Sequence, residues 1–430
     1  MNIKFERIQS HKNRLYFLCG FVCVVVLLVV LIVTRSHAKY RVTESIPLVN
    51  GTINYTLPDL NIVSLYIDGV EATELDSSKT YTLDTTQSTC TYKDGTEIEN
   101  LSISYDSETG GLSISPYTTK GTRCTLHFEE RVSASDTILA NYQNVLTRNN
   151  FRTTVTNTTT GTIYYADTSK GRTYYFAGNP TNNWVRWAGF YWRIIRINED
   201  GTLRLIYQGT SNTAIGSTTQ IGTSAFNSSY NDNAYVGFKY STNSVHGTGT
   251  NSTILGELNT WYQNNLTSYA DDLDGNAGFC GDRTPTSGTG LGTTYTEYGP
   301  YERLYENSSG VPTFECASDS DLYTTSGSSD GNKSLTYPIG LISMDEAWYA
   351  GGYSSNNTSY YLYTGQNYWT MSPYLYNTIG ARVFRVTSSG SLNYNYVDDT
   401  TPGVRPVINL GADITISSGN GTASNPYVIG

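Results

Sequence analysis

The chain has 430 residues, and its 27 Lys and Arg against 37 Asp and Glu give a net charge of −10. A nucleic-acid-binding domain presents a basic face, so this balance argues against nucleic acid as a partner. An aromatic share of 13% excludes a disordered chain, and a charged share of 15% excludes a helical bundle or coiled coil. The 37 Tyr and 40 Gly residues favour a chain of strands and loops, long enough for two or three domains.

The first predicted element is an apolar segment near the N-terminus. Residues 15–33 carry no charge and come close to the roughly 20 residues that span a bilayer. We predict a cytoplasmic tail over 1–14 and a transmembrane helix over 15–34, which makes the membrane a partner. The protein would then be a single-pass protein of the cell membrane with its C-terminal part extracellular. A cleaved signal peptide is the alternative, because Ser36 and Ala38 are small residues at a suitable spacing.

The cysteines agree with export. Beyond the apolar segment the chain has Cys90, Cys124, Cys280 and Cys316, and an even number in an exported chain suggests disulfides. Four cysteines allow three connectivities, of which we predict the local one, Cys90–Cys124 and Cys280–Cys316. A zinc site is the alternative, but the spacing shows no C-x-x-C pair, so no metal site is predicted.

The region after the apolar segment predicts strands. A stalk over 35–50 leads to residues 51–131, where short alternating runs such as Leu101–Tyr105 follow one another between turns. We predict a small, disulfide-linked all-β sandwich of Ig-like architecture over 51–131. A spacer that holds the next domain away from the membrane is its simplest function.

Residues 132–162 predict a short helix and a linker, and 163–430 predict one larger α+β domain. An Asp-Gly turn at 199–201 between apolar runs indicates a hairpin. Residues 252–269 have apolar residues at helical spacing, and a second helix begins at Ser343, with carboxylates in its first turn. Short strands separated by Gly and Pro follow from Tyr360 to the end.

Several motifs carry a resemblance. They are W-R-I-I-R-I-N-x-D-G-T at 192–202, L-N-T-W-Y at 258–262, F-C-x-D-R at 279–283, Y-P-I-G-L-I-S-x-D-E at 337–346, Y-W-T-x-S-P at 368–373 and G-V-R-P-V-I-N-L at 403–410. With them the chain resembles an uncharacterised family of exported, membrane-anchored bacterial proteins. Its last domain also resembles the C-type-lectin-like fold of the formylglycine-generating enzymes and the variable proteins diversified by retroelements. The resemblance implies a ligand face framed by these motifs but no substrate, because a fold does not determine a function.

The resemblance to the formylglycine-generating enzymes does not imply that this chain has their chemistry. They use a cysteine pair with copper, whereas Cys280 and Cys316 are predicted to be disulfide-bonded. Calcium-dependent lectins have Glu-Pro-Asn, Gln-Pro-Asp and Trp-Asn-Asp signatures, which this sequence lacks. The acidic turn at 271–276 lacks the downstream Glu of a calcium loop, so no cofactor is predicted.

The stretch 374–399 is the predicted ligand-binding face. Tyr offers a large amphipathic contact area at low entropic cost, and Asn offers adaptable hydrogen bonds, as in antibody loops. The ligand would be an extracellular protein or a glycan. The candidate residues are Tyr374, Tyr376, Asn377, Asn393, Tyr394, Asn395, Tyr396 and Asp398.

Two other functions stay open. Asp345 and Glu346 are paired carboxylates that could serve an extracellular hydrolase, although their place at a helix start also explains them. A serine triad would need a histidine, and the folded part contains His127 and His246 without a nucleophile motif. The second alternative function is that of a structural envelope protein without a ligand. We therefore expect a cell-surface binding protein rather than an enzyme, and assign no catalytic residue.

Overall fold

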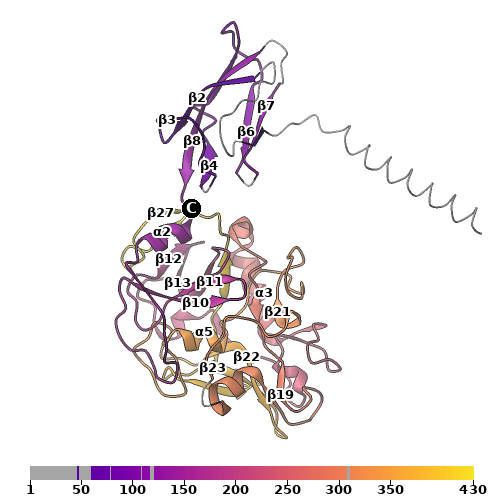
Figure 1. The fold of residues 1–430 in the computed structure, drawn as a ribbon. Coiled ribbons are helices and arrows are strands. Elements are labelled where there is room, and N and C mark those ends of the chain that lie inside the picture. The colour runs from indigo at the N-terminus through magenta and orange to yellow at the C-terminus, as the bar shows by residue number, and fades with distance from the viewer. Residues whose placement is uncertain (1–45, 48–59, 78, 108, 117–120, 308–309) are drawn as a thin grey trace, which may run out of the picture. The chain divides into compact units, whose positions relative to one another are not determined.

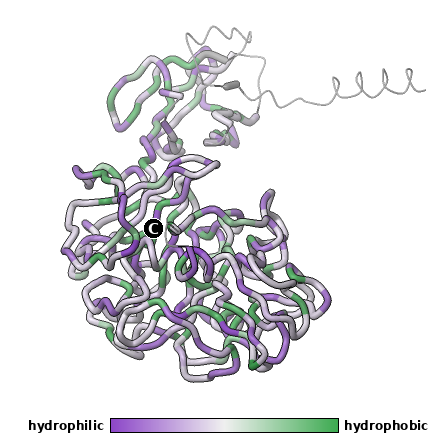
Figure 2. Tube along the Cα trace, turned by 60° about the horizontal axis from the view of Figure 1, so that its bottom comes forward, coloured by the Kyte–Doolittle hydropathy of each residue, from purple (hydrophilic) through white to green (hydrophobic). Residues whose placement is uncertain are grey.

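The computed structural model describes residues 46–47 and 60–430, except for 78, 108, 117–120 and 308–309. The chain divides into two compact units, Met1–Arg131 and Val132–Gly430 (Figure 1). In both, short hydrophobic stretches alternate with hydrophilic ones along the trace (Figure 2). Residues 1–34, which include the predicted tail and transmembrane helix, lie outside the described residues. Among the described residues, no helix is long and apolar enough to cross a membrane.

The described residues of the first unit form two sheets. One has the order β3-β2-β8-β4, with β5 also paired to β8, and the other has the order β1-β7-β6. The strands are β1 (Ile46–Pro47), β2 (Leu60–Ile67), β3 (Val70–Ala72), β4 (Thr80–Leu83), β5 (Thr89–Tyr92), β6 (Ser102–Asp106), β7 (Gly111–Ser115) and β8 (Thr122–Arg131). Alternation along β8 buries Cys124, Leu126 and Phe128 in the core, where Leu112 of β7 joins them.

The predicted disulfide Cys90–Cys124 is present, but the Ig-like topology is wrong. In immunoglobulin domains the disulfide joins the two sheets. Here it joins β5 to β8, which are neighbours in one sheet, and the two Cα atoms lie 4.1 Å apart. In addition, β2 runs parallel to β8, whereas an immunoglobulin sheet is antiparallel.

The second unit is built on a nine-stranded and a seven-stranded sheet. The first follows β27-β28-β12-β13-β11-β10-β9, with β14 between β13 and β26, and the second follows β15-β25-β22-β20-β19, with β23 between β22 and β24. The strands of the two sheets are β9 (Asn144–Leu146), β10 (Thr162–Thr168), β11 (Gly171–Tyr175), β12 (Trp184–Trp187), β13 (Phe190–Ile197), β14 (Leu203–Gly209), β15 (Gly222–Thr223), β19 (Pro285–Ser287), β20 (Thr296–Tyr298), β22 (Tyr368–Tyr376), β23 (Ala381–Val386), β24 (Leu392–Tyr396), β25 (Gly403–Val404), β26 (Val407–Leu410), β27 (Ile416–Ser418) and β28 (Tyr427–Ile429). Two small ribbons pair β16 (Lys239–Tyr240) with β17 (Thr250–Asn251) and β18 (Phe279–Cys280) with β21 (Leu322–Tyr323).

The helices of this unit are short. They are α2 (Ala134–Ala140), α3 (Thr253–Asn265), α4 (Gly299–Tyr301), α5 (Met344–Tyr349), the 3-10 turns η1 (Gly216–Thr219), η2 (Asn233–Val236), η3 (Thr267–Asp272) and η5 (Asp319–Asp321), and the π-helical turn η4 (Glu302–Glu306). Ser133, Ser252 and Ser343 cap α2, α3 and α5 through their hydroxyl oxygens, and Ser343 is the start predicted for the second helix. The predicted helix over 252–269 ends earlier, where η3 takes over.

For the residues that the structure describes, the predicted fold class, an Ig-like sandwich followed by a C-type-lectin-like α+β domain, is wrong. The described chain is mostly strand, and helices make up 14%. The predicted helices exist, but α2, α3 and α5 have only 7, 13 and 6 residues. The predicted hairpin of β13 and β14 is confirmed: Asp200 accepts hydrogen bonds from the backbone and hydroxyl of Thr202, and Gly201 has a φ of 85°.

The core of the second unit runs between the central strands. All nine residues of β22 and all seven of β14 are buried, which is typical of strands covered on both faces. Trp192, Trp348 and Trp369 are fully buried there. Residues 132–162 belong to this unit and contribute α2 and β9. The charged side chains described next are therefore held by a rigid frame.

Candidate functional site

A cavity of about 190 Å³ opens in the second unit beside the Cys280–Cys316 disulfide. Its walls come from several elements, including β13, β14, β18, β22 and α5. Six carboxylates and four cationic side chains line it. Buried charges are costly unless they are paired, so the pairing of these groups determines what the cavity can bind.

Glu346 is the most completely paired carboxylate of the cavity. It lies 4% exposed between Arg196 of β13, at 3.3 Å, and Arg204 of β14. Its Oε2 also accepts the backbone N–H of Ser343 at 2.9 Å, which completes a capping box on α5. Burial alone would raise the pKa of Glu346, but Arg204, Arg196 and Ser343 lower it below its ordinary value. Glu346 is thus held ionised and oriented.

Asp345 and Asp282 share one cation. Arg303 of η4 donates to both oxygens of Asp345, at 3.0 and 2.7 Å, and to Oδ2 of Asp282 at 2.7 Å. Asp345 also accepts the backbone N–H of Thr313 at 3.1 Å. Every carboxylate oxygen of the predicted hydrolase pair Asp345 and Glu346 therefore has a donor. The two residues line the cavity and start α5 at the same time.

Asp282 is the least satisfied charged group in the cavity wall. It is 4% exposed, and its Oδ1 is buried without a hydrogen-bond partner among the described residues. Burial raises the pKa of Asp282, and the charge of Asp345 adds to this effect, although Arg303 opposes it. Its backbone has a φ of 38°, in the left-handed region that is uncommon for residues other than Gly. A buried, partly unpaired and strained residue is typical of a functional site.

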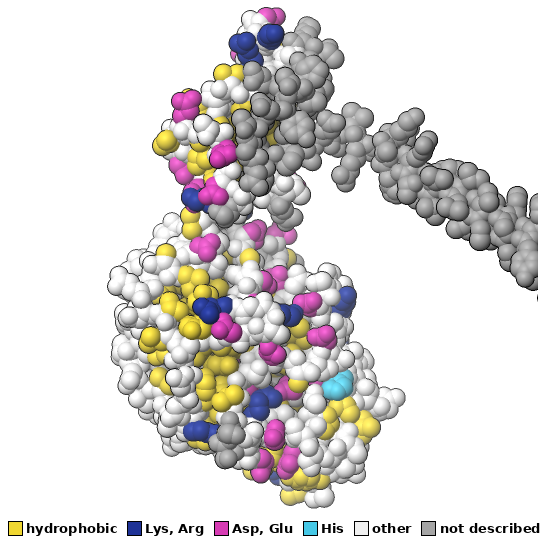
Figure 3. Space-filling model, in the orientation of Figure 1, with side chains coloured by type: hydrophobic (Ala, Val, Ile, Leu, Met, Phe, Trp, Pro, Cys, Tyr) yellow, Lys and Arg dark blue, Asp and Glu magenta, His cyan; other side chains and the backbone are white. Residues whose placement is uncertain are grey.

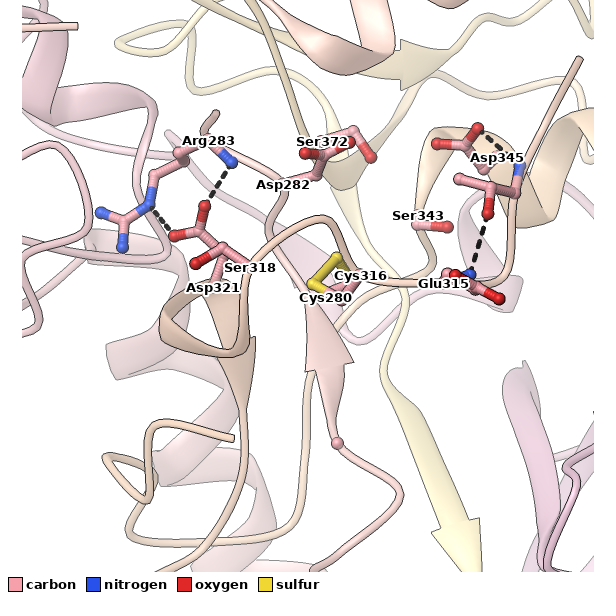
Figure 4. The surroundings of a disulfide bond; sticks show 12 residues. Cys280, Asp282, Arg283, Glu315, Cys316, Ser318, Asp321, Ser343, Asp345 and Ser372 are labelled. Atoms are coloured by element: carbon pink, nitrogen blue, oxygen red, sulfur yellow. Dashed lines mark hydrogen bonds and ion pairs between the residues drawn. A yellow bond between two sulfur atoms is a disulfide. The ribbon is translucent and has the colours of Figure 1, made fainter. Parts of the chain in front are cut away.

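The predicted disulfide Cys280–Cys316 is present and forms part of the cavity wall, with Cα atoms 5.5 Å apart. Figure 4 shows it in the middle of the labelled side chains, between the chain segments that carry Asp282 and Glu315. The bond ties β18 to the segment before η5. It therefore fixes the backbone next to Asp282.

His246 lies near this region but forms its own pair. Its Nδ1 is 2.9 Å from Oδ2 of Asp321, and Asp321 is fully buried. Arg283 donates to Asp321 from its Nε, at 2.8 Å, and from its backbone N–H, at 2.6 Å (Figure 4). Burial opposes ionisation of Asp321, but His246 and Arg283 outweigh it and lower the pKa of this carboxyl. The sequence places no nucleophile motif at this histidine.

The structure divides the predicted ligand-binding residues between two faces of the strands. Tyr394 and Tyr396 of β24 lie on one face, where Arg382 of β23 stacks on both rings, with its guanidinium carbon 4.9 and 4.6 Å from the centroids. Tyr374 lies under Tyr394, with ring centroids 4.2 Å apart, and is buried, as is Tyr376. Successive side chains of a strand point to opposite faces, so the neighbouring asparagines face away from these rings.

The polar residues of the prediction mostly stabilise their own turns. The Asn377 side chain accepts the backbone N–H groups of Ile379 and Gly380. Asn395 donates to Asp399, while Asn393 and Asp398 are exposed. The Tyr/Asn set is therefore not one continuous patch.

The aromatic face continues on elements that the prediction did not include. Tyr301 and Tyr305, from α4 and η4, pack against Tyr374 with ring centroids at 4.8 and 5.7 Å. Tyr295, just before β20, is 45% exposed, and Tyr305 is 37% exposed. We call the set Tyr295, Tyr301, Tyr305, Tyr374, Tyr394, Tyr396 and Arg382 the tyrosine face. The spacing of Tyr301 and Tyr305, four residues apart, is the one sequence signal that puts two of them on one side of a helical turn.

No described group of three or more His, Cys, Asp or Glu side chains could hold a metal ion. In the acidic turn at 271–276, Asp274 instead accepts the backbone N–H groups of Asn276 and Ala277. Comparisons of the chain with protein-family models, curated proteins and solved structures find no match. The family resemblance drawn from the motifs therefore stays a prediction.

Proposed function

We propose that this chain is an exported binding protein whose second unit contacts an extracellular protein through the tyrosine face. The observation that carries the proposal is the cluster of phenol rings around Arg382, in which Tyr295 is 45% and Tyr305 37% exposed. Tyr and Arg are the residues that most often supply binding energy at protein interfaces.

Two disulfides support the location outside the cytoplasm. Cys90–Cys124 and Cys280–Cys316 take up all four cysteines beyond residue 34. Structural disulfides persist in oxidising compartments and are rare in the cytosol. The uncharged residues 15–33 supply a segment suited to export.

The rings of the tyrosine face are held in place before any partner arrives. Tyr295 donates to Glu297 at 2.6 Å, Tyr301 donates to Glu306 at 2.6 Å, and Tyr305 donates to the Leu392 carbonyl at 3.0 Å. The hydrogen bond to Glu297 raises the pKa of Tyr295 to about 12, so its phenol stays protonated. Side chains ordered in advance lose less entropy on binding, which favours affinity.

The same hydrogen bonds favour a protein over a glycan as the partner. The hydroxyls of these three tyrosines are committed within the protein, and Arg382 donates to the hydroxyl of Tyr396 at 2.6 Å. These four tyrosines therefore offer a partner mainly ring surface. Charged side chains of both signs are interspersed over the part of the second unit seen in Figure 3.

Arrays of extracellular proteins and of glycans, probed with the purified protein, test the proposal. We expect protein ligands whose affinity falls by about tenfold or more in the double variant Tyr295→Ala and Tyr305→Ala. Tyr269→Ala is the matched control, because Tyr269 is 39% exposed and packs against Trp187 of β12 instead. Unchanged binding by the double variant, or ligands found on the glycan array alone, would contradict the proposal.

A further inference from the structure

The two disulfides of the chain differ in their surroundings. Cys90 and Cys124 are 4% and 0% exposed, in the core of the first unit. Cys280 and Cys316 are both half-buried, and both line the cavity of the second unit. A thiol must reach a sulfur atom to exchange with it, and exposed disulfides are the labile and regulatory ones. In the folded protein a small thiol should therefore reduce Cys280–Cys316 before Cys90–Cys124.

The loop that the Cys280–Cys316 bond closes carries part of the tyrosine face. The two cysteines are 36 residues apart, and Tyr295, Tyr301 and Tyr305 lie between them. Pairing of β20 with β22 holds the strand beside Tyr295 without the disulfide. Tyr301 ends α4, and Tyr305 lies in η4, a π-helical turn of five residues. A single turn has too few hydrogen bonds to be stable alone, so η4 depends on the side chains that anchor it.

One anchor of η4 leads back to the disulfide. Arg303 of η4 donates to Oδ2 of Asp282 at 2.7 Å and to both oxygens of Asp345. Asp345 is held in place by α5, whereas Asp282 lies two residues after Cys280 and has the unfavourable φ of 38°. Without the bond this stretch of backbone is free to relax. Arg303 would then keep one of its two carboxylate partners.

We propose that Cys280–Cys316 is a thiol-sensitive switch of the tyrosine face. The thiolate of a small-molecule thiol attacks one sulfur, forms a mixed disulfide with it and releases the other cysteine as a thiolate. A second thiolate then displaces the remaining cysteine. The protein gains two cysteine thiols, and the two reagent molecules leave as one disulfide.

Reduction lets the backbone around Asp282 relax, which loosens η4 and the tyrosines of α4 and η4. Loosened side chains lose more entropy when a partner orders them, so binding at the tyrosine face weakens. Reoxidation of the two cysteines restores it. The effect on binding rests on the function proposed above, whereas the reduction of the bond and the loosening of η4 do not.

The first step is tested by exposing the folded, full-length protein to 2-mercaptoethanol, which is small and uncharged and so suits a cavity of about 190 Å³ lined by charged groups. Free thiols are alkylated with N-ethylmaleimide at intervals, and the peptides are mapped by mass spectrometry. We expect alkylation of Cys280 and Cys316 to be at least about tenfold faster than that of Cys90 and Cys124. Equal rates, or the reverse order, would overturn the proposal.

The second step is tested by amide hydrogen exchange of the wild type in which only Cys280–Cys316 has been reduced. We expect residues 301–306 to lose protection at short exchange times, while the β13–β14 hairpin keeps its protection. The double variant Cys280→Ser and Cys316→Ser should exchange like the reduced protein and should not respond to 2-mercaptoethanol. Unchanged protection of 301–306 in the reduced wild type, or an equal loss in the hairpin, would count against the switch.

The third step is tested with the protein ligand that the arrays select. We expect the reduced protein to bind it at least about tenfold more weakly and to recover after reoxidation with 2-hydroxyethyl disulfide. Full affinity of the reduced protein, with 301–306 loosened, would refute the switch and leave the proposed function in place. Unchanged binding by the double variant Tyr295→Ala and Tyr305→Ala would instead contradict the proposed function, and the alkylation and exchange results would still decide the first two steps.

Discussion

At the scale of single residues, the second unit contains carboxylates in opposite electrostatic situations. Glu346 has two arginines and a backbone N–H, which lower its pKa. Asp282 shares Arg303 with Asp345, and burial raises the pKa of Asp282. The first group stabilises the fold, and the second is a buried charge that one shared arginine compensates only in part.

Replacing Glu346 should destabilise the second unit strongly. Glu346→Gln leaves Arg204 buried without its counter-charge and Arg196 with Glu199 alone, and breaking a buried pair costs about 3–5 kcal/mol. The folded-state pKa of Glu346 is lowered, so its contribution is present above the unfolded pKa and is lost as the pH falls through the folded pKa. We therefore expect urea unfolding to show the full loss at neutral pH and a smaller one in acid.

The control for this change is Glu257→Gln, an exposed glutamate on α3. It should alter the free energy of unfolding by less than about 0.5 kcal/mol. If the two variants were equally stable at neutral pH, Glu346 would not have the role assigned to it.

At the scale of elements, the Cys280–Cys316 disulfide links β18 to the segment that carries Phe314 and Glu315. Replacing both cysteines with Ser should lower the stability of the second unit by about 2–5 kcal/mol. Differential scanning calorimetry measures this effect. The matched pair Cys90→Ser and Cys124→Ser, in the other unit, should leave the unfolding transition of the second unit unchanged, and a loss of stability there would contradict this account.

Elements also show what the sequence can predict. Serine caps, the Asp-Gly turn and alternating strands depend on a few neighbouring residues, so α2, α3, α5 and the β13–β14 hairpin could be predicted from local patterns. The contribution of Tyr301 and Tyr305 to the tyrosine face could not, because these residues come from a turn about 90 residues before Tyr394. The separation of Asn393 from Tyr394 could have been predicted, because strand alternation puts them on opposite faces.

At the scale of the whole molecule, each of the two units has its own core and its own disulfide. The lectin-like assignment failed because motifs such as G-V-R-P specify local strands and turns rather than the order of strands in a sheet. The cavity was missed for a similar reason. Asp282, Arg303 and Asp345 lie in three separate segments, and only their packing makes one carboxylate oxygen unpaired.

The central claim, that the tyrosine face is the binding surface, is tested most directly by amide hydrogen exchange with and without the protein ligand that the arrays select. We predict slower exchange on binding in the backbone of 295–306 and 392–396, with no change around Tyr269. Protection confined to other segments, while 295–306 and 392–396 exchange as in the free protein, would contradict the claim.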